Sequence, residues 1–419
     1  MREMKDSGIG WIGFIPKEWD IHPVYYYFYE GKKRNYRCQE QNLLSLSYGK
    51  VKRKDINTSE GLLPASFNTY NIVKKGDIII RPTDLQNDKR SLRTGLVLEQ
   101  GIITSAYLDL VPRNKKIESR YFHYLLHSYD VMKVFYNMGN GVRQGLNYDE
   151  FSKLLLLSPS TSEQKAIADF LDMECKKIDE IMADVQSQID TLEDYKKSVI
   201  SEAVTKGLNP NVELKSTDVS WASKIPSHWS VMPNKYIMKK IKRICAIHKD
   251  EDIISLSMYG VIVRDLDAGG KMPTTFDGYQ FVYPGNLLMC LFDYDVTPRC
   301  IGYINNYGVT SPAYSQFEMI DGMDAKYYYY YYLMIDNTKE LLHLAKNLRH
   351  SFTEDELGKI NQIVPPYQEQ RAIADYLDKK CADIDSVIAD KKSQLDTLEE
   401  YKKSLIYEYV TGKKEVFAV

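Results

Sequence analysis

Two long segments of the chain carry apolar residues at every seventh position, with charged residues between them. Neither segment, 163–205 or 369–411, contains a glycine or a proline. A sustained seven-residue apolar repeat is typical of a helix that packs against another helix along a narrow seam. We therefore predict two long helices in a coiled coil. The seam positions are Leu171, Ile178, Val185, Leu192 and Val199 in the first helix and Leu377, Ile384, Leu398 and Leu405 in the second.

The second segment repeats the first after a constant shift of 206 residues, with 27 identities in 43 aligned positions. One seam position breaks the pattern, because Lys391 stands where Val185 predicts an apolar residue. At about 1.5 Å per residue each helix is roughly 60 Å long, which is too long to be buried on all sides. The natural partner of each apolar stripe is its own copy. Because the chain alternates globule, helix, globule, helix, we expect the two helices to pack antiparallel within one molecule.

The duplication extends to the regions before the helices. Trp11, Ile15, Pro16 and Trp19 recur 210 residues later, and short β-branched or aliphatic runs bounded by Gly, Asn or Asp follow in the same order in both halves. We predict an α+β protein in which two mixed α/β domains are joined by the two long helices. The predicted segments are a first domain at 1–157, a central helix at 158–207, a second domain at 208–364 and a C-terminal helix at 365–419.

Composition narrows the class of protein. With 44% hydrophobic and 27% charged residues in 419, the chain has enough apolar side chains for two or three packed domains. No stretch has the apolar length of a secretion signal or a membrane span, so we expect a cytoplasmic protein. Six cysteines without a CxxC pair predict free, buried thiols.

Charge is distributed unevenly between the two halves. Residues 1–157 hold 24 Lys and Arg against 17 Asp and Glu, a balance of +7, whereas residues 208–364 hold 16 against 18, a balance of -2. Only the first domain is therefore electrostatically suited by itself to a polyanion.

Sequence motifs for catalysis and metal binding are weak. Val364-Pro365-Pro366-Tyr367 resembles the catalytic motif of amino-DNA methyltransferases, but valine cannot accept a hydrogen bond from the target amine. His123 and His127 lie four residues apart without the glutamate of a zinc protease, so helix packing is the simpler interpretation. Tyr327 to Tyr332 offer rings for base stacking, yet six consecutive side chains point all round a helix and most must be packed. We predict no catalytic, cofactor or metal site on this chain.

Basic residues supply the candidates for contact with DNA. Arg143 and Arg349 fall in corresponding loops of the two halves and are suited either to DNA contact or to a structural ion pair. Two basic clusters, at 50–54 and at 239–243, either contact DNA phosphates or are simply solvated. The full set of candidates is Lys50, Lys52, Arg53, Lys54, Arg143, Gln144, Lys239, Lys240, Lys242, Arg243 and Arg349.

The layout of the whole chain resembles the specificity subunits of type I restriction-modification systems. The resemblance is carried by the W-x3-I-P-x2-W segment, by Glu163-Gln164 and Glu369-Gln370 after a proline, and by the doubled alternation of variable region and long helix. It implies that each variable region reads one half of a split target in double-stranded DNA and that the helices set the spacer. It also implies partner modification subunits, two in number, and restriction subunits. S-adenosylmethionine, ATP and Mg are then expected on those partners, with none bound by this chain.

Two other functions remain open from the residues alone. One is a coiled-coil scaffold with two ligand-binding modules and no DNA, and the other is a self-contained DNA methyltransferase or nuclease. DNA binding that depends on salt and requires both domains excludes the first. Activity of the purified chain with S-adenosylmethionine supports the second.

Overall fold

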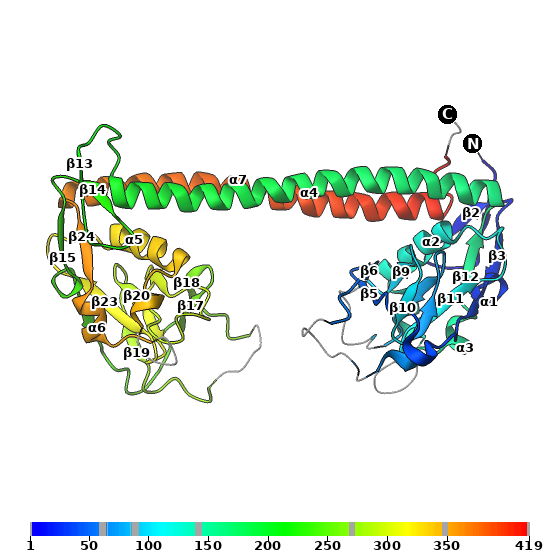
Figure 1. Ribbon diagram of the computed structural model, residues 1–419, viewed down its shortest axis with the longest axis horizontal. Helices are drawn as coiled ribbons and strands as arrows, with labels where there is room; N and C mark the ends of the chain where they lie inside the picture. Colours follow the sequence, from blue (N-terminus) through cyan, green and yellow to red (C-terminus); the bar gives the residue numbers. More distant parts are fainter. Residues whose placement is uncertain are drawn as a thin grey trace. The chain divides into compact units, whose positions relative to one another are not determined.

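The computed structural model describes residues 2–57, 64, 66–83, 85, 92–138, 145–267, 273–345 and 351–416 (Figure 1). Contacts divide the chain into two compact units, one formed by Met1–Val185 with Ser393–Val419 and the other by Gln186–Lys392. Each unit holds one mixed α/β domain together with part of each long helix. This architecture is the predicted α+β class.

A four-stranded antiparallel sheet forms the centre of each domain, with strand order β4-β11-β8-β9 in the first and β16-β23-β20-β21 in the second. The central strand β8 consists of three isoleucines, all fully buried, and it starts after a turn at Gly76, whose φ of +97° favours glycine. The strands of the first sheet are β4 (Phe28–Glu30), β8 (Ile78–Ile80), β9 (Thr94–Leu96) and β11 (Leu108–Pro112). Those of the second are β16 (Met238–Ile241), β20 (Leu287–Met289), β21 (Ile301–Tyr303) and β23 (Ser315–Met319).

Pairs of short antiparallel strands surround each sheet, and every pair has its counterpart in the other domain. In the first domain they are β1 (Met4–Asp6) with β2 (Phe14–Pro16), β3 (Asp20–Pro23) with β12 (Leu155–Ser158), β5 (Leu44–Ser47) with β6 (Lys50–Arg53), and β7 (Asn71–Val73) with β10 (Gly101–Ile103). In the second they are β13 (Leu214–Ser216) with β14 (Lys224–Pro226), β15 (Ser230–Pro233) with β24 (Asn361–Val364), β17 (Ile254–Ser257) with β18 (Gly260–Val263), and β19 (Gln280–Val282) with β22 (Gly308–Thr310).

One aromatic helix packs between each sheet and the long helices. In the first domain this is α2 (Ser119–Val131), which begins at a cap from Glu118, and in the second it is α5 (Ala325–Thr338), capped by Asp324. The remaining helices are α1 (Val24–Tyr27), α3 (Tyr148–Phe151) and α6 (Glu354–Lys359), with short 3-10 turns at Tyr36–Cys38, Phe67–Thr69, Val134–Asn137, Asn234–Tyr236 and Leu342–Leu344.

The two long helices are α4 (Thr161–Lys206) and α7 (Tyr367–Val410). They run antiparallel within each unit, because ion pairs join early positions of one helix to late positions of the other. Lys402 of α7 pairs with Asp179 of α4 in the first unit, and Lys196 of α4 lies 2.6 Å from Asp385 of α7 in the second. The antiparallel arrangement is the predicted one.

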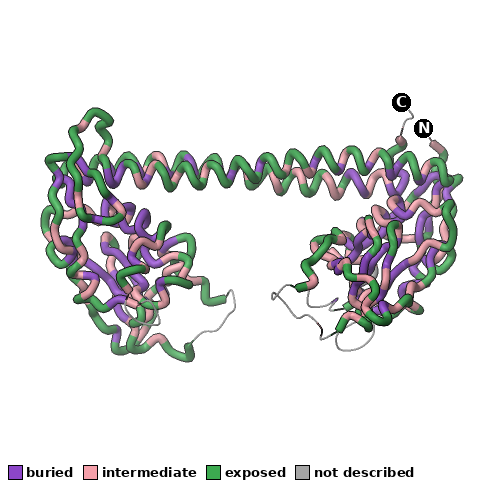
Figure 2. Tube along the Cα trace, viewed as in Figure 1, coloured by how far each residue is buried: buried purple, intermediate pink, exposed green. Residues whose placement is uncertain are grey.

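Burial along the long helices follows the seven-residue repeat (Figure 2). Leu171 and Leu377 are fully buried, whereas Leu192 and Leu398 are only half-buried. Lys391, the seam position with a charged residue, donates a hydrogen bond to Gln188 of α4. The other seam residues that are buried are Ile178, Val185, Ile384 and Leu405, while Val199 is half-buried.

A tyrosine at the start of each aromatic helix contacts the end of the long helix that starts at the other domain. The Tyr121 hydroxyl donates to the Val410 carbonyl of α7 at 3.2 Å, and Tyr327 donates to the Val204 carbonyl of α4 at 2.9 Å. The last carbonyls of a helix lack partners inside the helix. These two hydroxyls therefore satisfy buried helix ends and close each domain over a segment that is remote in sequence.

The repeated Glu-Gln pair at the start of each long helix attaches the tryptophan segment. Glu163 accepts a hydrogen bond from the Trp19 indole at 3.1 Å, and Glu369 accepts one from Trp229 at 2.9 Å. Gln370 donates to the Pro365 carbonyl and accepts from the backbone of Asp324, and Gln164 makes the same two kinds of contact. The identity of these residues in both halves thus has a structural cause.

The six cysteines are free. Five are buried as the sequence predicts, but Cys38 is only half-buried. It lies in the 3-10 turn Tyr36–Cys38, where its thiol contacts Asn68 at 3.2 Å, so the prediction that all six are buried is wrong at this position.

One buried carboxyl distinguishes the first sheet from the second. Asp109 of β11 is 2% exposed, and its Oδ1 atom has no hydrogen-bond partner. Burial, reinforced by Asp77 and Glu30, raises the pKa of Asp109 to about 8. The corresponding residue of β23 is Gln316, whose amide accepts a hydrogen bond from the backbone of Tyr283 at 2.9 Å. An uncharged group is thus present at this place in both sheets at neutral pH.

We expect Tyr121→Phe and Tyr327→Phe each to lower the free energy of unfolding by about 1–2 kcal/mol, because each leaves a buried carbonyl with one partner fewer. Urea unfolding measures this change. Tyr195→Phe is the matched control, since its ring is exposed on α4 and its loss of a hydroxyl costs little. Equal stability of all three variants contradicts the role of the two buried hydroxyls.

We expect Asp109→Asn to stabilise the first unit at pH 7 by about 1 kcal/mol or more. The folded state holds the Asp109 proton up to about pH 8, whereas the unfolded carboxyl loses it near pH 4. Stability therefore falls as the pH rises between these values, and the asparagine variant lacks this fall. Urea unfolding at pH 5 and pH 7 should show a gain that is smaller at pH 5. A pH-independent difference, or none, refutes the assignment.

Candidate nucleic-acid interface

The basic cluster predicted in the first domain lies on one strand of a two-stranded ribbon. Lys50, Lys52 and Arg53 belong to β6, which pairs with β5 so that Ser47 lies opposite Lys50 and Leu44 opposite Arg53. The turn between the strands has two residues, Tyr48 and Gly49, both with positive φ. Such turns match the twist of the strands they connect. The ribbon thus carries its basic side chains to the surface beside an exposed tyrosine.

The members of this cluster differ in their partners. The Lys50 ammonium lies 3.1 Å from Asp179 of α4, and Arg53 forms an ion pair with Glu99. Lys54 continues the ribbon, where its backbone N–H donates to the Leu43 carbonyl at 2.9 Å. Lys52 is exposed, and among the described residues it has no ion-pair partner. The charges of Lys50 and Arg53 are thereby partly neutralised within the chain.

The basic cluster predicted in the second domain occupies a different place. Lys239 and Lys240 lie on β16, an outer strand of the central sheet that corresponds to β4 of the first domain. Lys239 pairs with Glu318 on the neighbouring strand at 3.1 Å, and Lys240 lies 3.7 Å from Glu354. These carboxylates offset the charge of both lysines. Lys242 and Arg243 follow the strand, and the Arg243 guanidinium stacks over the ring of Tyr283 at 5.0 Å.

The second domain has the same ribbon, but its surface is apolar. β17 and β18 pair as β5 and β6 do, with Ile254 opposite Val263 and Ser257 opposite Gly260. Large apolar side chains are exposed along it: Met258, Tyr259, Ile262 and Val263. The positions of the basic residues do not indicate this ribbon, although LSLSYGKVKR at 44–53 aligns with ISLSMYGVIV at 254–263 in the sequence. The repeat of this segment in both halves is the feature of the sequence that indicates the second ribbon.

Three of the predicted candidates, Arg143, Gln144 and Arg349, lie outside the described residues.

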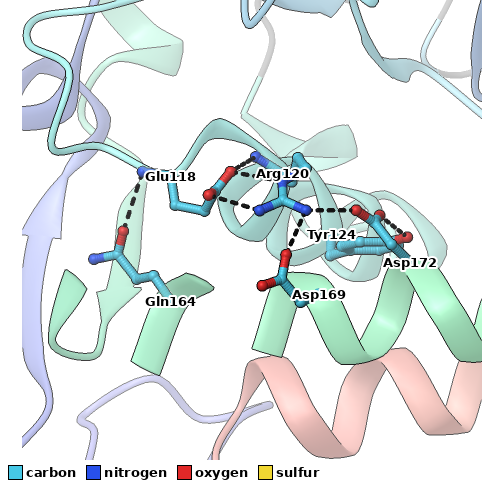
Figure 3. A network of polar contacts seen from close by, with 6 residues as sticks. All are labelled: Glu118, Arg120, Tyr124, Gln164, Asp169 and Asp172. Atoms are coloured by element: carbon cyan, nitrogen blue, oxygen red, sulfur yellow. Dashed lines mark hydrogen bonds and ion pairs between the residues drawn. The ribbon is translucent and has the colours of Figure 1, made fainter. Parts of the chain in front are cut away.

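A network of polar contacts fixes the first domain to the long helix (Figure 3). Arg120 of α2 is held by Glu118 and reaches Asp169 at 2.7 Å and Asp172 at 2.8 Å on α4. These carboxylates raise the pKa of the Arg120 guanidinium above its usual range. Tyr124 donates a hydrogen bond to the same Asp172 at 2.8 Å.

The second domain repeats the network with lysine in place of arginine. Lys326 of α5 pairs with Asp378 of α7, and Tyr330 donates to that carboxylate at 2.9 Å. Each single contact of this kind is partly exposed and contributes little stability. Several of them together orient the aromatic helix, and through it the sheet and the ribbon, relative to the long helix that starts from the same domain.

The two histidines considered for zinc line a pocket of about 550 Å³ between α2, α4 and the tip of the first ribbon. Burial lowers the pKa of His123 to about 3 and that of His127 to about 4, so both are neutral at pH 7. Throughout the described part of the chain, no group of three His, Cys, Asp or Glu is arranged to hold a metal ion. Both side chains are half-buried on the face of α2 that lines this pocket.

The other two motifs also have structural positions. Five of the six tyrosines from Tyr327 to Tyr332 are buried in the core of the second domain, and the half-buried Tyr329 accepts a hydrogen bond from Arg299. Val364 ends strand β24, where it pairs with Ser230, before the prolines that precede α7. The five buried tyrosine rings are therefore unavailable for stacking on a nucleic-acid base. Within the described residues, no helix is long and apolar enough to cross a membrane.

Comparison with known proteins finds similarities to one protein family and to a solved structure. Residues 25–191 match the family described as "Type I restriction modification DNA specificity domain". The chain is 24% identical over 324 residues to a protein of Methanocaldococcus jannaschii that is provisionally named the type I restriction enzyme MjaX specificity subunit, covering 74% of this chain and 71% of that protein. It is 23% identical over 339 residues to the type I restriction enzyme MjaVIII specificity subunit of the same organism, covering 76% and 75%.

A solved structure shares the fold along nearly the whole chain. It comes from work on complex assembly and conformational transition of the type I R-M system, and it superposes with a TM-score of 0.68 at 13% identity, covering 96% of this chain and 99% of that one. The family match lies in one half and the shared fold extends through both. The chain therefore carries a type I restriction modification DNA specificity domain at residues 25–191, and over most of its length it is similar to the specificity subunits of type I restriction enzymes.

Proposed function

We propose that this chain reads a bipartite DNA target, with one half-sequence read by each domain. The observation that carries the proposal is the contrast within the duplication. The attachments of the two domains to the long helices are the same, from the Glu-Gln pairs to the aspartates beneath α2 and α5, whereas their exposed ribbons differ in chemistry. Equivalent scaffolds with unlike surfaces suit two similar modules that recognise different sequences.

We further propose that the long helices set the spacer between the two half-sequences. Both helices pass through both units, since α4 is continuous from Thr161 to Lys206 and α7 from Tyr367 to Val410. A helix has a fixed rise per residue, so its length defines a separation that a flexible linker cannot define. Exchanging a domain while keeping the helices should thus leave the spacer unchanged.

We propose two modification subunits as partners, docked on the long helices. Exposed apolar residues recur there at equivalent positions: Ile181 corresponds to Val387, and Tyr195 to Tyr401. The ion pair Asp179–Lys402 brings Ile181 and Tyr401 to the same level of the helix pair in the first unit, and Lys196–Asp385 does the same for Tyr195 and Val387 in the second. Two equivalent patches suit two copies of one partner.

In this proposal the chemistry belongs to the partners. Modification subunits hold S-adenosylmethionine and transfer its methyl group, and restriction subunits use ATP and Mg for translocation and cleavage. The chain supplies recognition in the cytoplasm, where the host DNA lies. Lack of activity of the purified chain alone with S-adenosylmethionine is the expected result.

The experiment replaces residues 20–157 with the corresponding region of another specificity subunit in the assembled methyltransferase. Methylation of a library that varies both half-sequences and the spacer reads out the result. We expect one half-sequence to change, with the other half and the spacer length as in the parent complex. The control is the parent complex on the same library. A change in both half-sequences, or in the spacer alone, contradicts the proposal.

A further inference from the structure

We propose that each domain reads its half-sequence by placing its two-stranded ribbon in the major groove, and that the second domain does so through Ile262 and the methyl group of thymine. In the first domain, Lys52 occupies the corresponding position and contacts guanine. This inference rests on the proposed function and deepens it, because it assigns the base contacts to residues.

The two ribbons are one element in two chemical versions. Each has four residues in each strand and a two-residue turn, and their registers match position by position. Lys52 lies opposite Ser45, and Ile262 lies opposite Ser255. The serines are retained in the two ribbons, so both present hydroxyls that can contact base edges or phosphates.

The inner face of each ribbon packs directly on the central sheet. A Cβ atom added at Gly95 of β9 would lie 2.9 Å from Val51, and one added at Gly302 of β21 would lie 2.5 Å from Val261. Glycine at this place in both sheets lets the ribbon approach the strand below it. Because side chains alternate along a strand, the residues next to these inward positions face away from the core. Lys52 and Ile262 are such residues.

The outward face of the second ribbon is apolar without being covered. Ile262 is 42% exposed, and Tyr259 at the turn is 82% exposed. Its turn is held in shape by Arg299, which donates to the Met258 carbonyl at 3.3 Å and to the Ile301 carbonyl at 3.1 Å, and which also contacts Tyr329. The apolar side chains are therefore presented on a fixed support.

The major groove admits a two-stranded ribbon, and it is the groove in which all four base pairs can be told apart. Lysine there pairs with the acceptor atoms of guanine, whereas an apolar side chain contacts the thymine methyl group. This assignment also fits the charges, because the basic first domain attracts the polyanion and the second, with a balance of -2, carries apolar contacts where the first has lysines. A duplex is thus the occupant that suits both ribbons in equivalent positions.

The test uses the assembled methyltransferase on its own target, determined first by sequencing methylated host DNA. Each thymine of the second half-sequence is replaced in turn by deoxyuridine, which lacks only the methyl group. At one position we expect the methylation rate at limiting DNA to fall about fourfold, the effect of losing one buried methyl group. The variant Ile262→Lys should show no further loss at that position. Insensitivity of the parent complex to every such replacement overturns the proposal.

The reciprocal arm uses 7-deazaguanine, which lacks the acceptor atom N7, in the first half-sequence. We expect a loss of tenfold or more at one guanine in the parent complex, and none in Lys52→Ile. The matched control for Ile262→Lys is Leu214→Lys, which adds the same charge at an exposed apolar position of the second domain. This control should keep the full response to deoxyuridine. A 7-deazaguanine response that is identical in Lys52→Ile and the parent overturns the assignment to the first ribbon.

Two other results separate this inference from the function on which it rests. If the complex methylates a bipartite target and Ile262→Lys prevents assembly with the modification subunits, the ribbon is a protein-docking element and the inference fails alone. If no bipartite target is methylated, the proposed function fails as well. Ile262→Ala, which adds no charge to the fold, repeats the deoxyuridine arm should the lysine variant not fold.

Discussion

The structure depends on one feature of the two long helices: each starts at one domain and ends against the core of the other. A buried tyrosine hydroxyl meets a helix-end carbonyl at each return, from Tyr121 to Val410 and from Tyr327 to Val204. Because each helix starts where the other ends, the two must run antiparallel. The apolar seam of one helix must then be in register with that of the other. The seven-residue repeat, the ion pairs at Asp179 and Asp385 and the closed domain cores are consistent with this one requirement.

The same requirement explains what is repeated in the chain and what is not. Residues that attach a domain to a helix recur almost unchanged, because the Glu163–Trp19 contact and the Glu369–Trp229 contact must have the same geometry at the start of both long helices. Lys52 and Ile262 lie on the outward faces of their ribbons, so both are compatible with the same closure. Recognition can thus diverge on a scaffold whose closure does not change.

The sequence was sufficient for the helices, the duplication and the antiparallel arrangement, because periodicity and repetition are properties of the chain itself. It was less informative about the extent of burial. Leu192 and Leu398 have the same place in the repeat as Leu171, yet they are half-buried. Leu171 belongs to the core of the first domain, whereas Leu192 lies outside both domain cores. The position of Lys391 shows the same effect, because a half-covered seam tolerates a lysine that reaches Gln188.

The candidate site was harder to predict, because charge alone does not locate a surface. Lys239 and Lys240 form a basic cluster in the sequence, but the acids that offset them come from another strand and from α6, far away in sequence. The ribbon of the second domain contains no basic residue, so the charge pattern of the sequence does not indicate it. Its identity emerged from strand register, which places Ile262 where the first ribbon has Lys52.

Hydrogen exchange on a chain that ends at Lys392 tests the closure most directly. Removal of residues 393–419 deletes the end of α7 but leaves every residue of the second unit in place. The account predicts that amide protection is lost in α2 and in the first half of α4, and that α5 and its sheet keep the protection of the full chain. Unchanged protection of α2 in the shortened chain would contradict the account, because the first domain would then be complete without the returning helix.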